Sequence, residues 1–361
     1  MLTMDDVARR AGVARSTVSH VLNGRHNANV RIPESTRRRV LDAAQELGYH
    51  PNALARSVRS GKTRMIGYLV EDQIYEPYWK TIVGALNEAE QADFSLKLLS
   101  ATPETFAQRI QQCMELRLSG MIVRYCFDKS FLFEEAQRAG IPVVSVDEDV
   151  PQPYGARVAA DDAVGCREAV SHLVQLGHRK IAFITAGFYR KPPELVPVRE
   201  SHFLAELASH GLPVPEGYIV AEEMVVYGSG TELEIDTSTV LAATSRLLTH
   251  PEGRPTAIVC WRDEAAIVAM QACRRAGLRV PEDMSVVGFS DIQAARTSDP
   301  SLSTCQSPWD EMGRTAVRQL VRALDLEDPS RETILIPSRF IARHSSGPVP
   351  PVVQEGCVVA L

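Results

Sequence analysis

The chain of 361 residues has few of the features that mark membrane, secreted or fibrous proteins. It contains no run of 18 apolar residues, so no segment is long enough to cross a bilayer. Its first six residues include two acids and no apolar core, which argues against a secretion signal. Only 22 glycines and 22 prolines are present, too few for a collagen-like or disordered protein. The composition, 45% hydrophobic and 6% aromatic, is that of a globular protein, and the length predicts two or three domains.

Cysteine is scarce and dispersed. The seven cysteines stand singly and form no CxxC pair, at positions 113, 126, 166, 260, 273, 305 and 357. An odd, scattered set predicts reduced buried thiols in a cytoplasmic protein and excludes a disulfide framework or a zinc site. The sequence also contains no nucleophile elbow, so we expect no catalytic residues, no metal and no cofactor.

The modest net charge of −6 is unevenly distributed. Residues 1–62 hold 11 Lys and Arg against 5 Asp and Glu, whereas the remaining 299 residues hold 28 against 40. Such an asymmetry predicts a small basic module that meets a polyanion, carried on an acidic body. The alternative is chance clustering of charge.

Three short helices are expected within the first fifty residues. Thr3 and Asp6 have the spacing of a capping box before the first helix, which ends at Gly12. A second helix is expected from about Arg15 to Leu22, and a third from Ile32-Pro33 to Leu47. Because a tight turn separates the first two, the pattern predicts a helix-turn-helix.

The second helix has one apolar and one polar face. Val18, Val21 and Leu22 are predicted to pack inward, and the polar residues fall on the opposite face: Arg15, Ser16, Ser19, His20 and Asn23. A recognition helix reads base edges near its N-terminus, so we expect Arg15 to contact guanine, with polar contacts from Ser16 and His20. Thr17, Ser19 and Asn23 suit phosphates. The alternative is the solvated face of an ordinary helix.

From Met65 onward, strand-like apolar runs alternate with amphipathic segments. The expected strands are Met65–Val70, Leu96–Leu99, Met121–Val123, Val143–Val146, Ile181–Thr185, Ala257–Cys260 and Ser285–Phe289. The expected helices between them include Tyr78–Gln91, Phe106–Leu118, Gly165–Leu176 and Glu264–Ala276. This alternation predicts an α/β fold with parallel, doubly wound sheets, and about 280 residues suffice for two of them.

Several long motifs closely resemble the LacI/GalR family of bacterial transcription regulators. They are MDDVARRAGVARSTVSHVLNG, TRRRVLDAAQELGYHPNALARSVRSGKT, VQLGHRKIAFI (174–184) and GLRVPEDMSVVGFSDIQAA (277–295). The resemblance is dense over residues 3–67 and continues, more weakly, to about residue 345. It implies a helix-turn-helix headpiece, a hinge, and a dimerising two-lobed body that is similar to periplasmic sugar-binding proteins, with an effector between the lobes.

The resemblance also implies where the chain divides. We expect the DNA-binding domain at residues 1–49 and the hinge helix at 50–62. The chain would cross between lobes near residues 158, 304 and 329. The first subdomain would then comprise residues 63–157 and 304–328, and the second residues 158–303 and 329–345. Residues 346–361 are expected to form a disordered tail, and the alternative is a contact segment.

The hinge and headpiece depart from the family pattern. In the family a hinge leucine wedges into the minor groove, and Val58 stands at that position. Ala14 replaces the usual serine that caps the recognition helix. The loop from Asn23 to Ile32 is longer than usual, and its Arg25 either contacts a phosphate or is solvated. The expected DNA-binding residues are Thr3, Arg15, Ser16, Thr17, Ser19, His20, Asn23, Arg25, Asn52, Ala55 and Val58.

Unusual residues stand at the expected carboxyl ends of the strands, where parallel sheets bind ligands. Arg124 follows one strand, Arg199 matches the family's effector-contacting arginine, and Arg262 replaces an asparagine before Asp263. Ser290 replaces the first aspartate of the usual GFDD. The expected effector-binding residues are Glu71, Tyr75, Arg124, Arg199, Arg262, Asp263, Ser290 and Asp291.

Arginine forks suit carboxylates and phosphates, so three arginines favour an anionic effector such as a sugar acid or sugar phosphate. The alternative is that Arg124 or Arg262 pairs with a local acid such as Glu71, Asp72 or Asp263. We therefore expect a homodimeric, effector-controlled repressor of a carbohydrate or related catabolic pathway. It would bind a pseudo-palindromic double-stranded DNA operator and no membrane. The alternative function is a soluble small-molecule binding protein without specific operator recognition.

Overall fold

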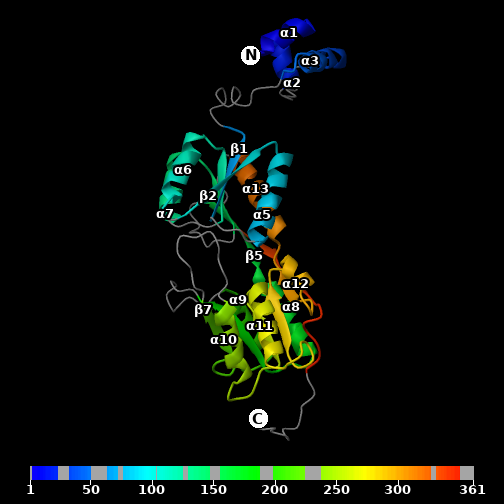
Figure 1. Cartoon of the computed structure of the whole chain (residues 1–361). Helices are drawn as coiled ribbons and strands as arrows, with labels where there is room; N and C mark the ends of the chain where they lie inside the picture. Colours follow the sequence, from blue (N-terminus) through cyan, green and yellow to red (C-terminus); the bar gives the residue numbers. More distant parts are fainter. Residues whose placement is uncertain are drawn as a thin grey trace. The chain divides into compact units, whose positions relative to one another are not determined.

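The computed structural model divides into two compact units, Met1–Thr63 and Arg64–Leu361 (Figure 1). It describes residues 2–22, 32–49, 63–71, 76–102, 104–124, 129–146, 155–187, 198–223, 237–326 and 331–349. Within these ranges, no helix combines the length and the apolar character needed to cross a membrane.

The first unit contains the three expected helices: α1 (Met4–Ala11), α2 (Arg15–Leu22) and α3 (Glu34–Glu46). Thr3 and Asp6 form the predicted capping box, and Gly12 ends α1 in the left-handed conformation, with φ of 64°. The valines Val7, Val18 and Val40, one from each helix, have no exposed surface and form the centre of the core. The helix-turn-helix prediction is therefore confirmed.

The second unit contains two six-stranded sheets, which define two lobes. The first sheet is entirely parallel, in the order β11-β5-β4-β3-β1-β2. Its strands are β1 (Met65–Glu71), β2 (Ser95–Ala101), β3 (Gly120–Val123), β4 (Val143–Val146), β5 (Gly155–Asp161) and β11 (Thr333–Pro337). One face packs on α5 (Glu76–Gln91) and α13 (Trp309–Leu326), the other on α6 (Phe106–Glu115) and α7 (Lys129–Arg138) (Figure 1).

The second sheet has the order β12-β10-β9-β8-β6-β7, in which only the short β12 is antiparallel to its neighbour. Its strands are β6 (Ile181–Gly187), β7 (Ile219–Glu223), β8 (Ala257–Cys260), β9 (Ser285–Phe289), β10 (Ser303–Gln306) and β12 (Arg339–Ile341). The helices of this lobe are α8 (Asp162–Gln175), α9 (Val198–Ser209), α10 (Thr237–Leu248), α11 (Asp263–Arg275) and α12 (Gln293–Thr297). Helices α8 and α9 cover one face, and α10 and α11 cover the other.

Continuous apolar runs explain why these sheets are central. Every residue of β3, β4, β8 and β9 is buried, as expected for strands covered by helices on both faces. Glycines then allow the helices of the first lobe to approach closely. An added Cβ at Gly84 of α5 would overlap a carbonyl oxygen of α13, and one at Gly313 of α13 would overlap a carbonyl of α5. The α/β, two-sheet prediction is confirmed.

The crossings between the lobes differ from the expected boundaries at 158, 304 and 329. Strand β5 stays in the first sheet to Asp161, and β10 stays in the second sheet to Gln306. Strand β11 returns to the first sheet and pairs with β5 as far as Pro337, so residues 333–337 do not belong to the second lobe. Strand β11 contains the short apolar run Ile334–Ile336, but the run ends at Pro337, and a proline argues against a strand.

The expectation of a disordered tail at 346–361 is wrong for its first residues. Ser346 Oγ lies 3.0 Å from His172 Nε2, the Gly347 carbonyl lies 3.0 Å from His178 Nε2, and the Val349 amide donates to Leu176. These hydrogen bonds hold residues 346–349 against the second lobe. Residues 350–361 lie outside the described part of the chain.

The five described cysteines are free and buried, as predicted: Cys113, Cys166, Cys260, Cys273 and Cys305. Burial raises the pKa of Cys166 to about 12 and that of Cys113 to about 11. Such thiols are protonated and unreactive at neutral pH. Cys126 and Cys357 lie outside the described residues.

Candidate functional site

The outer face of α2 is polar and accessible. Arg15 and Ser16 are exposed, while Val18 and Val21 are buried beneath them. Arg15 Nη1 lies 3.6 Å from Asp5 Oδ2, and both side chains are more than half exposed, so this ion pair contributes little and leaves the guanidinium accessible. The His20 ring is oriented by its Nδ1, which donates to the Ser16 carbonyl at 2.7 Å. This is the arrangement expected of a recognition helix.

Other expected DNA contacts are not all placed. The Thr3 hydroxyl donates to Asp6 Oδ2 at 2.7 Å, so its role within the chain is to cap α1. The Ala14 carbonyl accepts the first hydrogen bonds of α2 from Thr17 and Val18, without a side-chain cap. Five expected contacts lie outside the described residues: Asn23, Arg25, Asn52, Ala55 and Val58.

In the second lobe, Arg199 connects three elements at the carboxyl ends of the strands. It extends from α9, and its Nε donates to Asp162 Oδ2 at 2.8 Å while its Nη1 donates to the Trp261 carbonyl at 2.6 Å. Its guanidinium also stacks on the Phe289 ring, 4.7 Å from the centroid. Asp162 at the start of α8 therefore balances the charge of Arg199.

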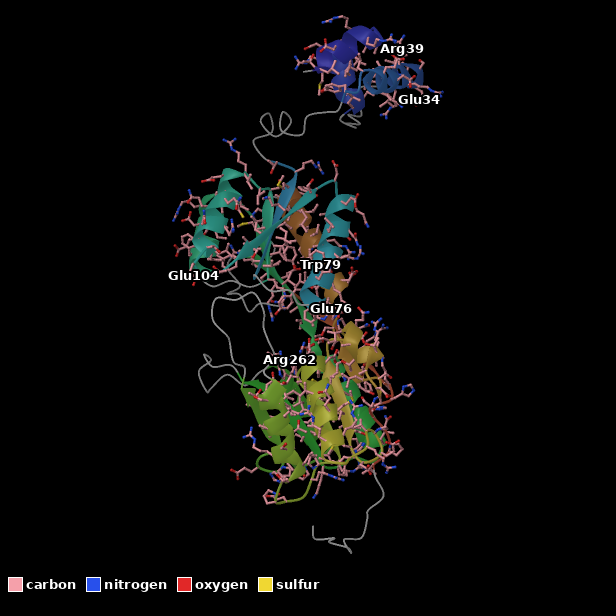
Figure 2. All side chains as sticks on the ribbon, in the orientation of Figure 1. Glu34, Arg39, Glu76, Trp79, Glu104 and Arg262 are labelled. Carbon is pink, nitrogen blue, oxygen red and sulfur yellow. The ribbon has the colours of Figure 1, made fainter. Side chains whose placement is uncertain are left out.

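Arg262 also has an acidic partner, and this partner was missed by sequence reasoning. Arg262 follows β8, and its Nη2 lies 2.5 Å from Oε1 of Glu222 in β7 (Figure 2). Both side chains are buried, with exposed fractions of 8% and 1%. Burial raises the pKa of the Glu222 carboxyl above its ordinary value, and Arg262 and Trp261 act in the opposite direction. Of the expected partners, Asp263 binds Ile292 and Thr304 instead, and Asp72 and the side chain of Glu71 lie outside what the structure describes.

Asp263 and Asp291 support the site rather than line it. Asp263 is fully buried, with Oδ2 accepting from the Ile292 amide at 2.9 Å and Oδ1 accepting from the Thr304 hydroxyl. Asp291 is equally buried and accepts hydrogen bonds from Arg296, Arg343 and Gln306.

Ser290, whose backbone φ is 117°, is also buried and precedes Asp291 in the same loop. Although burial opposes ionisation of Asp291, the hydrogen bonds from the two arginines lower its pKa below the ordinary value. The loop after β9 is thus held by the carboxylates of Asp263 and Asp291, whose oxygens already accept hydrogen bonds. These bonds orient the backbone of the loop.

In the first lobe, Arg124 follows β3 as predicted. Its guanidinium stacks on the Tyr78 ring of α5, 3.3 Å from the centroid, and lies 5.9 Å from the Trp309 ring at the start of α13. Aromatic faces hold a guanidinium in a fixed orientation without neutralising its charge. Tyr75, Asp72 and the side chain of Glu71 lie outside what the structure describes.

Further residues at these strand ends carry buried polar atoms. Thr185 Oγ1 of β6, Asp162 Oδ1, Arg262 Nε and Ser307 Oγ have no hydrogen-bond partner within the described ranges. Buried polar groups are nearly always satisfied, so such atoms indicate a place where a polar ligand or ordered water binds. Thr185 and Ser307 could have been found only by placing their strands in register.

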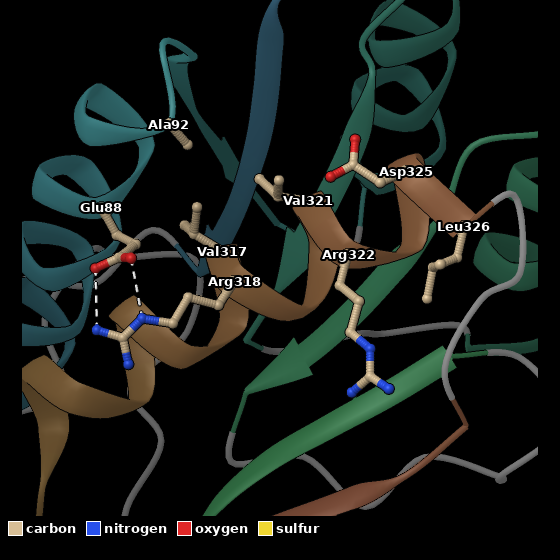
Figure 3. A pocket seen from close by; sticks show the side chains of 8 residues that line it. All are labelled: Glu88, Ala92, Val317, Arg318, Val321, Arg322, Asp325 and Leu326. Atoms are coloured by element: carbon tan, nitrogen blue, oxygen red, sulfur yellow. Dashed lines mark hydrogen bonds and ion pairs between the residues drawn. The ribbon is translucent and has the colours of Figure 1, made fainter.

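A hollow of about 480 Å³ lies elsewhere, between α5 and α13 (Figure 3). It is lined by Glu88, Ala92, Val317, Arg318, Val321, Arg322, Asp325 and Leu326. Arg318 binds Glu88 through two hydrogen bonds, of 2.9 and 3.1 Å. Because Glu88 and Ala92 lie where α5 leads into β2, the hollow faces the amino ends of the strands. It is separate from the arginine sites.

A helix-turn-helix unit followed by a two-lobed body with polar residues at its strand ends is the architecture of a ligand-responsive DNA-binding regulator. Residues 3–52 match the model of bacterial regulatory proteins, lacI family, and residues 170–346 match that of the periplasmic binding protein-like domain. The chain is 30% identical over 349 residues to the ribose operon repressor of Haemophilus influenzae, covering 96% of this chain and 98% of that protein.

Other relatives agree. The probable HTH-type transcriptional repressor ExuR of Bacillus subtilis is 28% identical, with 96% of this chain and 98% of the relative covered. The fold is similar to that of a lac repressor dimer bound to operator and the anti-inducer ONPF, with a TM-score of 0.73 at 23% identity, covering 96% and 99% of the chains.

The chain belongs to the lacI family of bacterial regulatory proteins. Its class is that of sequence-specific DNA-binding transcriptional repressors, and its relatives are regulators rather than enzymes.

Proposed function

We propose that this protein is an effector-controlled repressor that binds a pseudo-palindromic operator as a homodimer and regulates a carbohydrate or related catabolic pathway. The observation that carries the proposal is the exposed polar face of α2, with Arg15 and Ser16 above a fully buried apolar core. That face is joined in one chain to a two-lobed body of the periplasmic-binding-protein type. A relative named as a ribose operon repressor supports the pathway class.

Dimerisation is supported by an apolar stripe on α5. Trp79 is 59% exposed (Figure 2), and Leu86, two helical turns further along α5, is 47% exposed. Large side chains of this kind are enriched at protein interfaces, and a single recognition helix reads too few bases for specific binding. A second copy of the chain provides both a cover for the stripe and a second headpiece.

The proposed effector is a sugar acid or phosphorylated sugar bound at the carboxyl ends of the strands. Arg199 and Arg262 form ion pairs inside the second lobe, so their charges are already balanced there. Arg124 lies in the first lobe at the carboxyl end of β3, stacked on Tyr78, and is a candidate contact for the anionic group of the effector. The hydroxyl groups of the effector would face the second lobe.

The proposal is tested by gel shift on the DNA that flanks the protein's own gene. The full chain should produce a specific, competitor-resistant complex, and a chain lacking residues 1–60 should not. Light scattering should show two chains per operator. Thermal-shift screening with sugar acids, sugar phosphates and neutral sugars then identifies the effector class, because a ligand of the folded body raises its melting temperature. Equal affinity for operator and random DNA would contradict the proposal.

A further inference from the structure

Two ion pairs lie side by side at the carboxyl ends of the second sheet. Arg199 binds Asp162 at 2.8 Å, and Arg262 binds Glu222 at 2.5 Å. Arg199 also donates to the carbonyl of Trp261, the residue before Arg262, so the two guanidiniums belong to one assembly. Among these four side chains, each of the two positive charges is matched by one negative charge.

The positive charge of Arg262 lies at a position that favours a negatively charged partner. It is the N-cap residue of α11, a helix of 13 residues whose N-terminus carries a partial positive charge. A guanidinium at such a position creates an anion-binding arrangement of the kind that helix ends provide for phosphates and carboxylates. The face of Trp261, 4.6 Å from the Arg262 guanidinium carbon, holds the group in place.

We propose that Glu222 occupies this anion position and thereby determines effector specificity: it keeps carboxylates and phosphates away from the second lobe, so that the part of the effector bound there is an uncharged, hydroxyl-bearing group. This inference rests on the proposed function, because it assumes that the strand ends form the effector site. It adds which part of the effector lies against the second lobe, namely its hydroxyl groups, which face the Glu222–Arg262 pair.

The remaining polar atoms near the two ion pairs also favour a hydroxyl-bearing group. Arg262 Nε is a donor, Asp162 Oδ1 is an acceptor and Thr185 Oγ1 is either, and none has a hydrogen-bond partner in the described segments. A carboxylate or phosphate can only accept from such a set, whereas a hydroxyl group both donates and accepts. Buried ion pairs are often no more stabilising than well-packed apolar residues of similar volume, so stability alone does not account for this pair.

The test compares the full-length protein with Glu222→Gln, Glu222→Gln/Arg262→Gln and the control Glu88→Gln. Glu88 pairs with Arg318 between α5 and α13, so the control removes a paired carboxylate away from the site. Calorimetry measures the dissociation constants of matched probes: D-galactose against D-galacturonate, and D-glucose against D-glucuronate. We expect Glu222→Gln to raise the preference for the hexuronate at least about tenfold in one pair, because it leaves Arg262 as an uncompensated buried charge.

The double variant should return that preference to the wild-type value, and the control should leave it unchanged. A change below about twofold in both pairs, or one that persists after Arg262→Gln, overturns the proposal. If Glu222→Gln does not fold in a chloride buffer, the proposal is tested instead by the refolding yield of Glu222→Ala, measured in buffers with and without acetate. A yield that acetate raises, and only while Arg262 is present, supports the proposal, and a yield independent of acetate overturns it. Operator binding in the gel shift is unaffected by either outcome, so failure here is distinguishable from failure of the proposed function.

Discussion

At the scale of single residues, hydrogen bonding rather than burial separates the groups that orient the site from those proposed to face it. Asp263 and Asp291 stand in the loop positions where the sequence predicts effector ligands, yet both are fully buried and their oxygens are occupied. Asp263 joins the start of α11 to the loop after β9 and to Thr304 of β10. Its carboxylate therefore acts on the effector site through the position of the backbone.

Asp263 should make stability depend on pH. Burial raises its pKa to about 7, although the hydrogen bonds from Thr304 and Ile292 oppose this. Between about pH 4 and 7 the folded protein holds a proton that the unfolded chain has lost, so stability falls as pH rises and is constant above that window. We expect Asp263→Asn to remove this dependence. The unfolding free-energy difference between wild type and variant should change by roughly 2–4 kcal/mol across the window.

The measurement is urea denaturation at several pH values, followed by fluorescence. Glu134→Gln, at an exposed position of α7, is a control for the general effect of removing a carboxyl group. A difference between wild type and Asp263→Asn that stays constant from pH 4 to pH 7 would show that the carboxyl titrates normally.

Arg15 should contribute to the choice of operator sequence. It is exposed at the start of α2, and its 3.6 Å contact with Asp5 is too exposed to compete with a guanine. Arg15→Ala should weaken binding to the specific operator by about 1–3 kcal/mol and relax preference at one base pair. Arg15→Lys retains the charge but not the fork, and should lose most of the specificity. Footprinting measures the affinity of each variant for specific and for random DNA. An equal loss of affinity on both would identify a phosphate contact instead.

At the scale of helices and strands, the sequence is most informative where a segment carries its own signal. The bounds of α2 and of β4, β8 and β9 agree with the predictions, because a following glycine or a continuous apolar run marks each of them. Edge strand β11 was not predicted, because its apolar run Ile334–Ile336 ends at Pro337 and a proline argues against a strand. The Glu222–Arg262 pair could not be predicted, because its partners are 40 residues apart and meet only through sheet register.

Helix α2 begins without a side-chain cap, which gives a prediction at this scale. The exposed Ala14 supplies a carbonyl to Thr17 and Val18 but no side-chain acceptor for the free amides of the first turn. Ala14→Ser should stabilise α2 by about 1 kcal/mol. Amide hydrogen exchange on the full chain measures this as slower exchange in α2, with α3 as the internal reference. Unchanged protection in α2 would mean that another group already caps it.

At the scale of the whole molecule, the two lobes are in contact through a small set of polar groups. Glu76 of α5 accepts from the Gln293 amide, and Lys80 of the same helix donates to the Asp291 carbonyl at 3.1 Å. Asp291 is in turn bound by Arg343 and Arg296. The loop after β9 thus connects the second lobe to α5, the helix that carries the proposed dimer surface. We expect a change at the proposed effector site to reach α5 through this loop.

Arg199 provides the test of that connection. Arg199→Ala should abolish the response to effector while leaving operator affinity nearly unchanged, because the headpiece is a separate compact unit. The substitution also leaves Asp162 buried without its partner, which should lower the melting temperature of the body. The double variant Asp162→Asn/Arg199→Ala should recover stability but not the response. Operator binding, measured with and without effector for all three proteins, separates the two effects. If the double variant regains the response, Arg199 acts only by holding Asp162, and the effector is bound by other groups.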